Sequence, residues 1–439
     1  MKKFLLFGMA LSAIINPNPI KAVLNAKQSD PSALGFMQGF PPPRDKLLST
    51  KNNEFFNFPA LRYSVNHMNE FYPTSITATD STNHYKVETK IDKNIENVMF
   101  TPWGEQKQIS FKDALDINYT DGIIILHKGK IVYENYPSSG TQRDTRHAAM
   151  SLSKSFTGTL AAILADEGVI DPNKPVTYYL PELKNSGYEG ASVRNVMDMT
   201  TAIKYSEDYN NPDAEIWGFA LSGQTVKPDG YKGPRNYYEY LSSTVKEKDK
   251  EHGSEFGYKT INTEVLGWII TRCTGKKLNE LLSEKIWKKM GAMYDGYYMI
   301  SADGIPFAGG GYNLSLIDAA YFGETMRCKG KLGGKRIISE RVIEDIMENG
   351  GSKENIEQFE KSGEYPLLKG WGYRDMWWCT NNSHGAFMAR GVHGQAIYVD
   401  PKAEMVIARF ASSPLASNKY IDPHSIPLYE AVADYLMKK

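Results

Sequence analysis

The segment AAMSLSKSFTGTLAAILADEG, residues 148–168, contains the strongest local pattern in the chain. Apolar residues recur at helical spacing from Phe156 to Leu164, small residues between them permit close packing, and Gly168 follows as a helix stop. The pattern predicts a buried central helix. Ser151 and Lys154 stand three residues apart at its start, so their side chains should lie on one face, one turn apart.

A serine and a lysine placed in this way form a chemical pair. A serine hydroxyl is a weak nucleophile until a base removes its proton, and a lysine amine can be that base if its surroundings lower its pKa. The helix N-terminus adds partial positive charge and free backbone N–H groups. The pair therefore predicts acyl transfer through a covalent acyl-enzyme on Ser151.

A second copy of the pattern, Ser243 to Lys246, lies in the charged run LSSTVKEKDKEHG. No apolar stripe accompanies this run, which is typical of a solvated surface. The helical context therefore favours Ser151 and Lys154 as the catalytic pair.

Composition excludes several classes of protein. The chain has 439 residues, with 51 Lys plus Arg against 51 Asp plus Glu, so its net charge does not indicate a nucleic-acid partner. Its three cysteines allow at most one intramolecular disulfide and are too dispersed for a zinc site. We expect no metal and no cofactor, and the oligomeric state stays open.

The first 26 residues have the layout of a secretory signal peptide. Two lysines precede an apolar run from Phe4 to Ile15, which is short for a membrane span. Cleavage between Ala13 and Ala26 would give a periplasmic or secreted protein without stable membrane insertion. An uncleaved anchor is the alternative.

The rest of the chain divides into an extension and a catalytic unit. Residues 27–100 are rich in Pro, Asn, Thr and Ser, and are expected to pack on the body as an extension. Within them, LRYSVNHMNEFYPT predicts a short helix ended by Pro73. Residues 101–439 form the predicted catalytic domain, with a mostly helical lobe at about 165–300.

The catalytic domain carries strand patterns near both of its ends. GIIILHKGKIVYENY predicts two strands around a tight turn at Lys128-Gly129. GAFMARGVHGQAIYVDP and EMVIARFASS predict an antiparallel pair, and LYEAVADYLMKK predicts a closing helix. We therefore expect an α/β (α+β) fold, in which an antiparallel sheet is flanked by helices and a cleft separates it from the helical lobe.

Two further segments supply candidate site residues. Tyr258, in a loop that leads into a predicted helix, is a candidate proton relay to the leaving group; the alternative is simple packing. His393-Gly394-Gln395 lies in a strand-like segment where Gly394 permits close approach of substrate. The backbone N–H groups of Gln395 and Ser151 are the candidate oxyanion donors. His393 is either a structural hydrogen-bonding group or a substrate contact.

Other hydrolase classes lack their motifs here. The sequence contains no Gly-x-Ser-x-Gly elbow, which argues against an α/β-hydrolase. It also contains no His-Glu-x-x-His motif, which argues against a metallohydrolase.

In order, these motifs resemble the serine β-lactamase-like superfamily of class C β-lactamases, D-alanyl-D-alanine carboxypeptidases and related esterases. Ser151-x-x-Lys154 matches the first family motif. Tyr258-Lys259-Thr260 fills the Tyr-x-Asn position, and Val392-His393-Gly394 fills the Lys-Thr-Gly position with only the glycine kept. The resemblance implies a β-lactamase/transpeptidase-like fold in which Lys154 activates Ser151.

Longer segments are similar to one branch, the 6-aminohexanoate-dimer hydrolase-like proteins. These segments are LRYSVNHMNEFYPT, NVMDMTTAIKYSEDYNNPDAE, YKTINTEVLG and RGVHGQAIYVDP. The resemblance implies that Tyr258 protonates the leaving group and later helps to activate water. It also implies substrate contacts from the loop after Tyr205. The implied contacts are Tyr205, Asp208, Tyr209 or Trp217 in this loop. His393 and Gly394 are further candidate substrate-binding residues.

The third motif departs from the family pattern in a way that bears on specificity. β-Lactamases and peptidases hold a substrate carboxylate with a cation there, whereas this chain has Val392, and His393 is usually neutral at pH 7. The leading hypothesis is an exported serine hydrolase that cleaves a carboxylic ester or linear amide. The alternatives are a β-lactamase or D,D-peptidase acting on cell-wall-type substrates, and a non-catalytic protein that binds cell-wall fragments.

Overall fold

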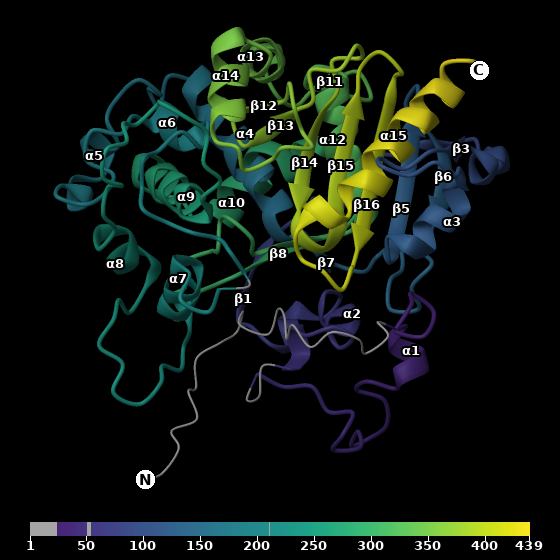
Figure 1. Cartoon of the computed structure of the whole chain (residues 1–439), viewed down its shortest axis with the longest axis horizontal. Coiled ribbons are helices and arrows are strands. Elements are labelled where there is room, and N and C mark those ends of the chain that lie inside the picture. Colours follow the sequence, from purple (N-terminus) through teal and green to yellow (C-terminus); the bar gives the residue numbers. More distant parts are fainter. Residues whose placement is uncertain (1–23, 51–53, 210) are drawn as a thin grey trace.

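The computed structural model describes residues 24–50, 54–209 and 211–439, and an eight-stranded sheet forms its centre (Figure 1). The strands are antiparallel except for β2, which pairs in parallel with β6. In sheet order they are β12 Gly372–Arg374, β13 Trp377–Cys379, β14 Phe387–Gly391, β15 Gln395–Asp400, β16 Met405–Ala411, β5 Thr120–His127, β6 Lys130–Asn135 and β2 Glu88–Thr89.

The predicted hairpin between β5 and β6 is confirmed. β5 is buried along its whole length, in keeping with its run of isoleucines. Lys128 and Gly129 form the two-residue turn with φ of 50° and 76°. Positive φ at both positions matches the right-handed twist of the flanking strands.

Helices cover both faces of this sheet. Figure 1 shows α15, Asp422–Leu436, in front of the strands, while α12, Leu316–Arg327, packs behind β5, β15 and β16. The predicted central helix is α4, Ser153–Asp166, whose residues are buried from Ser153 through Leu164. Gly168 follows it with φ 74°, as expected of a helix stop.

The helical lobe lies beside the sheet and packs on α4 through α9 (Figure 1). Its elements are α5 Val176–Tyr179, α6 Val193–Met197, α7 Glu215–Gly223, α8 Tyr237–Ser242, α9 Thr260–Thr274, α10 Leu278–Leu282, a π-helical turn Ser283–Trp287 and α11 Lys288–Met290.

A second, four-stranded sheet joins the N-terminal segment to the catalytic body. Its order is β1 Thr74–Thr77, β8 Gly296–Met299, β9 Tyr312–Leu314 and β7 His147–Ala148. The helix predicted between Leu61 and Pro73 is α2, Leu61–Ser64, followed by a 3₁₀ turn, Met68–Glu70. Because β7 ends three residues before Ser151, this sheet brings the extension close to the start of α4.

Buried charges anchor the extension. Arg62 of α2 donates to Asp121 Oδ1 of β5 at 3.0 Å and to Ser412 Oγ at 3.1 Å. His147 Nε2 lies 3.2 Å from the other Asp121 oxygen, and Arg62 also donates to Ser29 Oγ at 3.0 Å. These bonds tie the N-terminal segment to β5 and β7.

The prediction of one continuous strand over residues 385–401 is wrong. The chain reverses at Val392–Gly394, so the segment forms two paired strands, β14 and β15. His393 and Gly394 have φ of 64° and 102°, which a continuous strand does not contain. Apolar residues on both sides of the turn conceal it from a periodicity argument. The pair β15 and β16 is confirmed.

The three cysteines of the chain, Cys273, Cys328 and Cys379, are free thiols. Within the described ranges, no helix combines the length and apolar character needed to cross a bilayer. Most of the expected signal peptide lies outside the described residues.

Candidate active site

Ser151 stands at the junction between β7 and α4. It lies in a single 3₁₀ turn, Met150–Leu152, that leads directly into α4. Met150 adopts a left-handed backbone with φ 51°, which costs a non-glycine residue of the order of 1 kcal/mol. This sharp entry leaves Ser151 partly exposed at the helix start, whereas Leu152, Ser153 and Lys154 are buried.

Lys154 is held against the serine. Its Nζ lies 3.0 Å from Ser151 Oγ and donates to the Gly309 backbone oxygen at 2.7 Å. Burial lowers the pKa of Lys154 to about 8, although the carboxylates of Glu207 and Glu264 oppose the shift. A substantial fraction of this amine is therefore neutral near neutral pH and able to accept the serine proton.

Tyr258 lies next to both Ser151 and Lys154. Its ring centre lies 5.0 Å from Lys154 Nζ, and its hydroxyl hydrogen-bonds the Ser151 side chain. Burial and the charge of Glu207 raise the pKa of this phenol above its usual value. Tyr258 therefore remains protonated and can donate to a leaving group, while Trp378 packs on its ring at 5.5 Å.

Two carboxylates that the sequence reasoning missed support these groups. Glu264 of α9 accepts from Gly309 N at 2.7 Å and from Ala308 N at 3.2 Å. Glu264 therefore holds the backbone of Ala308 and Gly309 in place, and the Gly309 oxygen accepts the hydrogen bond from Lys154 Nζ. Burial raises the pKa of Glu264 to about 8. Glu207 accepts from the Thr260 backbone N–H.

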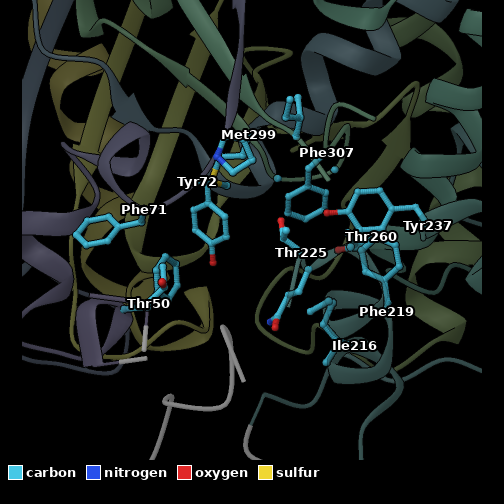
Figure 2. Close-up of a pocket in the computed structure, with 18 of the residues that line it drawn as sticks. Thr50, Phe71, Tyr72, Ile216, Phe219, Thr225, Tyr237, Thr260, Met299 and Phe307 are labelled. Carbon is cyan, nitrogen blue, oxygen red and sulfur yellow. The ribbon is translucent and has the colours of Figure 1, made fainter. Parts of the chain in front are cut away.

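A cavity of about 680 Å³ opens beside Ser151. Figure 2 shows aromatic side chains on two opposite walls, with Phe71 and Tyr72 facing Phe219, Tyr237 and Phe307. A mostly apolar cavity of this size suits a small organic ligand.

Comparison with known proteins places this geometry in a family. The family model described as Beta-lactamase matches residues 120–424. Over 304 residues the chain is 38% identical to the 6-aminohexanoate-dimer hydrolase of Paenarthrobacter ureafaciens, covering 69% of this chain and 75% of that protein. The chain belongs to the beta-lactamase family.

Solved structures agree with this assignment. A protein from Bacillus anthracis, provisionally assigned as a 6-aminohexanoate-dimer hydrolase, superposes with a TM-score of 0.77 at 31% identity, covering 89% of this chain and 99% of that one. A family VIII carboxylesterase shares the fold with a TM-score of 0.55 at 18% identity, covering 80% of this chain and 100% of that one. The expected α+β, β-lactamase/transpeptidase-like fold is confirmed, and this beta-lactamase-family chain is a serine hydrolase.

The structure brings together the three residues predicted for catalysis in this family member. Ser151, Lys154 and Tyr258 converge from one helix start and one loop. Tyr209 borders the cavity beside Ser151. Trp217, also predicted as a substrate contact, is buried, and its indole N–H donates to Asn211 O at 2.8 Å.

The third predicted segment has a different placement. The His393 side chain is buried, its Nδ1 lies 2.7 Å from Ser413 O, and burial lowers its pKa to about 4. Gly394 packs against Ala411 rather than lining the cavity. His393 is therefore neutral and part of the protein interior.

Val392, rather than the predicted Gln395, lines the cavity beside Ser151. The Gln395 side chain donates to Val392 O at 3.1 Å and to Ala411 O, and the residue begins β15. Val392 borders the cavity together with Ser151, whereas Gln395 is buried behind it. The chain reversal at Val392–Gly394 separates Val392 from Gln395, which begins the next strand.

The second Ser-x-x-Lys pair lies on the surface. Ser243 donates to Tyr240 O at 2.7 Å, and Lys246 forms an ion pair with Glu251 at 2.6 Å. Both residues are exposed. Among the described residues, no cluster of His, Cys, Asp or Glu could hold a metal ion.

Proposed function

We propose that this protein hydrolyses carboxylic esters or linear amides through an acyl-enzyme on Ser151. The observation that carries the proposal is the contact of Lys154 Nζ with Ser151 Oγ, combined with a lysine pKa of about 8. The neutral amine takes the hydroxyl proton as Ser151 Oγ attacks the substrate carbonyl. The backbone N–H groups of Ser151 and Val392 are the proposed oxyanion donors.

Tyr258 completes the proposed cycle. Its protonated hydroxyl donates to the departing alkoxide or amine, and a water molecule then cleaves the acyl-enzyme. Tyr258, which has lost its proton to the leaving group, takes a proton from that water as it attacks, and protonated Lys154 returns its proton to Ser151 Oγ at the end of the cycle. The name of the Paenarthrobacter ureafaciens relative, 6-aminohexanoate-dimer hydrolase, supports linear amides as one substrate class.

A covalent serine probe tests the proposal. A fluorophosphonate should label the wild-type protein and the Ser243→Ala variant, and it should leave Ser151→Ala unlabelled. Labelling that persists in Ser151→Ala would place the nucleophile elsewhere. A folded wild-type protein that takes no label and turns over no ester or amide would favour the binding-protein alternative.

Weak activity on β-lactams is part of the proposal. The third motif offers the apolar Val392 and a buried, neutral His393 where a β-lactamase uses a cation for the substrate carboxylate. Penicillins and cephalosporins should therefore be poor substrates compared with short acyl esters. Rapid β-lactam turnover by purified protein would instead support the β-lactamase or D,D-peptidase alternative.

We also propose export, with cleavage before Leu24. The Leu24 backbone oxygen accepts from Tyr119 OH at 2.8 Å, and Ala26 O accepts from the buried Arg62. Removing these residues with the signal would break both contacts. N-terminal sequencing of protein from the periplasmic fraction should find a start at or before Leu24, and uncleaved protein in the membrane fraction would support an anchor.

A further inference from the structure

We propose that the N-terminal extension forms one wall of the acyl pocket, and that this pocket selects uncharged, bulky apolar acyl groups. The inference rests on the proposed function and adds its substrate class. Thr50, Phe56, Phe71, Tyr72 and Pro73 all border the cavity that contains Ser151. They precede residue 120, where the family match begins, so this wall lies outside the matched domain.

Aromatic packing within the extension holds the residues of this wall in place. Phe71 stacks on Phe55 at 4.5 Å between ring centres, and Tyr72 meets the same ring edge-on at 6.0 Å. Directly after Pro73, β1 pairs with β8 of the catalytic body. Figure 2 shows the Tyr72 hydroxyl directed into the space between the two walls.

The opposite wall comes from the helical lobe. Phe219 of α7 stacks on Tyr237 of α8 at 4.8 Å, and Phe307 lies 6.0 Å from Phe219. A Cβ at Gly223 would overlap the Tyr237 ring, so the glycine leaves room for this aromatic pair. Two aromatic walls that face each other favour an aliphatic or aromatic acyl group.

The cavity offers little to a charged acyl group. Among its described lining residues, Lys227 and Asp229 alone carry a formal charge. Lys227 donates to the Leu221 and Ser222 backbone oxygens at 2.9 and 2.7 Å, so its ammonium is engaged by the end of α7. Asp229 is exposed. An ammonium carried deep into the pocket would lose water without gaining a buried carboxylate among these lining residues.

The test compares p-nitrophenyl acetate, hexanoate and 6-aminohexanoate as substrates. Each buried methylene should raise kcat/KM by about fourfold, so hexanoate should exceed acetate by more than tenfold. The 6-aminohexanoate ester, which has the same chain with a terminal ammonium, should fall at least tenfold below hexanoate. Equal rates for hexanoate and 6-aminohexanoate would overturn the selection for uncharged groups.

Variants assign the selection to the two walls. Tyr72→Ala should reduce the hexanoate-to-acetate ratio at least fivefold, chiefly through KM, while Tyr72→Phe should keep it. Ala220→Leu, which narrows the cavity from α7, should lower the hexanoate-to-acetate ratio of kcat/KM. The matched controls are Phe40→Ala, exposed in the same extension, and Ala431→Leu on α15.

The outcomes separate this inference from the proposed function. Unchanged ratios in both Tyr72→Ala and Ala220→Leu, with acetate still hydrolysed, would overturn the role of the walls and leave the serine hydrolase standing. Absence of turnover for all three esters, together with no probe labelling, would refute the proposed function itself.

Discussion

The pKa of Lys154 leads to a quantitative prediction about acylation. A buried lysine with a pKa near 8 rather than 10.5 has a neutral fraction at pH 7 that is roughly 300-fold larger, because one pH unit corresponds to a factor of ten. About one molecule in ten then carries a neutral base at pH 7. Only the neutral amine can accept the Ser151 proton, so acylation should rise with pH.

The perturbation is Glu264→Gln. The negative charge of Glu264 raises the pKa of Lys154, and the carboxyl itself has a pKa of about 8, so the two groups titrate together. The variant removes this charge and keeps an oxygen for Gly309 N. The Lys154 pKa should therefore fall, and the acidic limb of the pH profile should move to lower pH.

The assay is kcat/KM for p-nitrophenyl acetate between pH 6 and 10, corrected for spontaneous hydrolysis. This quantity reports ionisations of the free enzyme. The wild-type limb should have its midpoint near pH 8 and fall about tenfold per pH unit below it. The control is Glu182→Gln, which replaces an exposed glutamate paired with Arg272 and should leave the limb unchanged. A midpoint above pH 9.5, or a shift of Glu264→Gln to higher pH, would refute the argument.

Three further substitutions test the relay and the scaffold. Tyr258→Phe should lower kcat by about 100-fold or more if the hydroxyl transfers a proton in the rate-limiting step, as measured by steady-state kinetics. Arg62→Met should lower the free energy of unfolding by about 3–5 kcal/mol in urea titrations, because it leaves Asp121 buried without its guanidinium. Gly158→Ala should cost about 1–3 kcal/mol and reduce activity, since its Cβ would overlap Asp375 O and displace α4.

Each of these substitutions has a matched control. Tyr178→Phe changes an exposed tyrosine on α5 and should preserve kcat. Arg341→Met removes an exposed arginine paired with Asp166 and should change stability by about 1 kcal/mol or less. Gly218→Ala on α7 places its Cβ at ordinary contact distance from Tyr240 and should be tolerated. Equal effects in a variant and its control would remove the specific contact as the cause.

Local patterns predicted much of the fold and the central pair. The run of isoleucines before Lys128-Gly129 and the small and apolar residues after Ser151 are short-range signals, and the structure contains the hairpin and the helix they predict. The turn at His393 escaped prediction because apolar residues continue on both sides of it. The left-handed backbone of His393 does not change the hydrophobic periodicity of the segment, so the pattern does not reveal the turn.

The supporting carboxylates and the pocket wall depend on contacts between distant parts of the chain. Glu264 accepts a hydrogen bond from Gly309 N. The Gly309 oxygen accepts one from Lys154, which lies 155 residues earlier in the sequence. The sequence around Glu264 contains no pattern that predicts these contacts. Tyr72 likewise becomes a pocket residue only after β1 pairs with β8. Sequence reasoning could identify the Ser151–Lys154 pair, whereas its surroundings required the tertiary structure.

The pKa values of Lys154 and Tyr258 support different proposed roles for the two groups, and Glu207 gives a way to test these roles. Lys154 has a pKa of about 8, while the pKa of Tyr258 lies above its usual value, so the lysine is neutral first and the tyrosine remains the proton donor. The charge of Glu207 raises the pKa of both groups. Glu207→Gln should therefore move the acidic limb of the kcat/KM profile to lower pH, while activity should hold up to pH 10 because Tyr258 stays protonated. An acidic limb that stays in place in this variant, or a wild-type activity that declines again before pH 10, would contradict the roles of Lys154 as base and Tyr258 as acid.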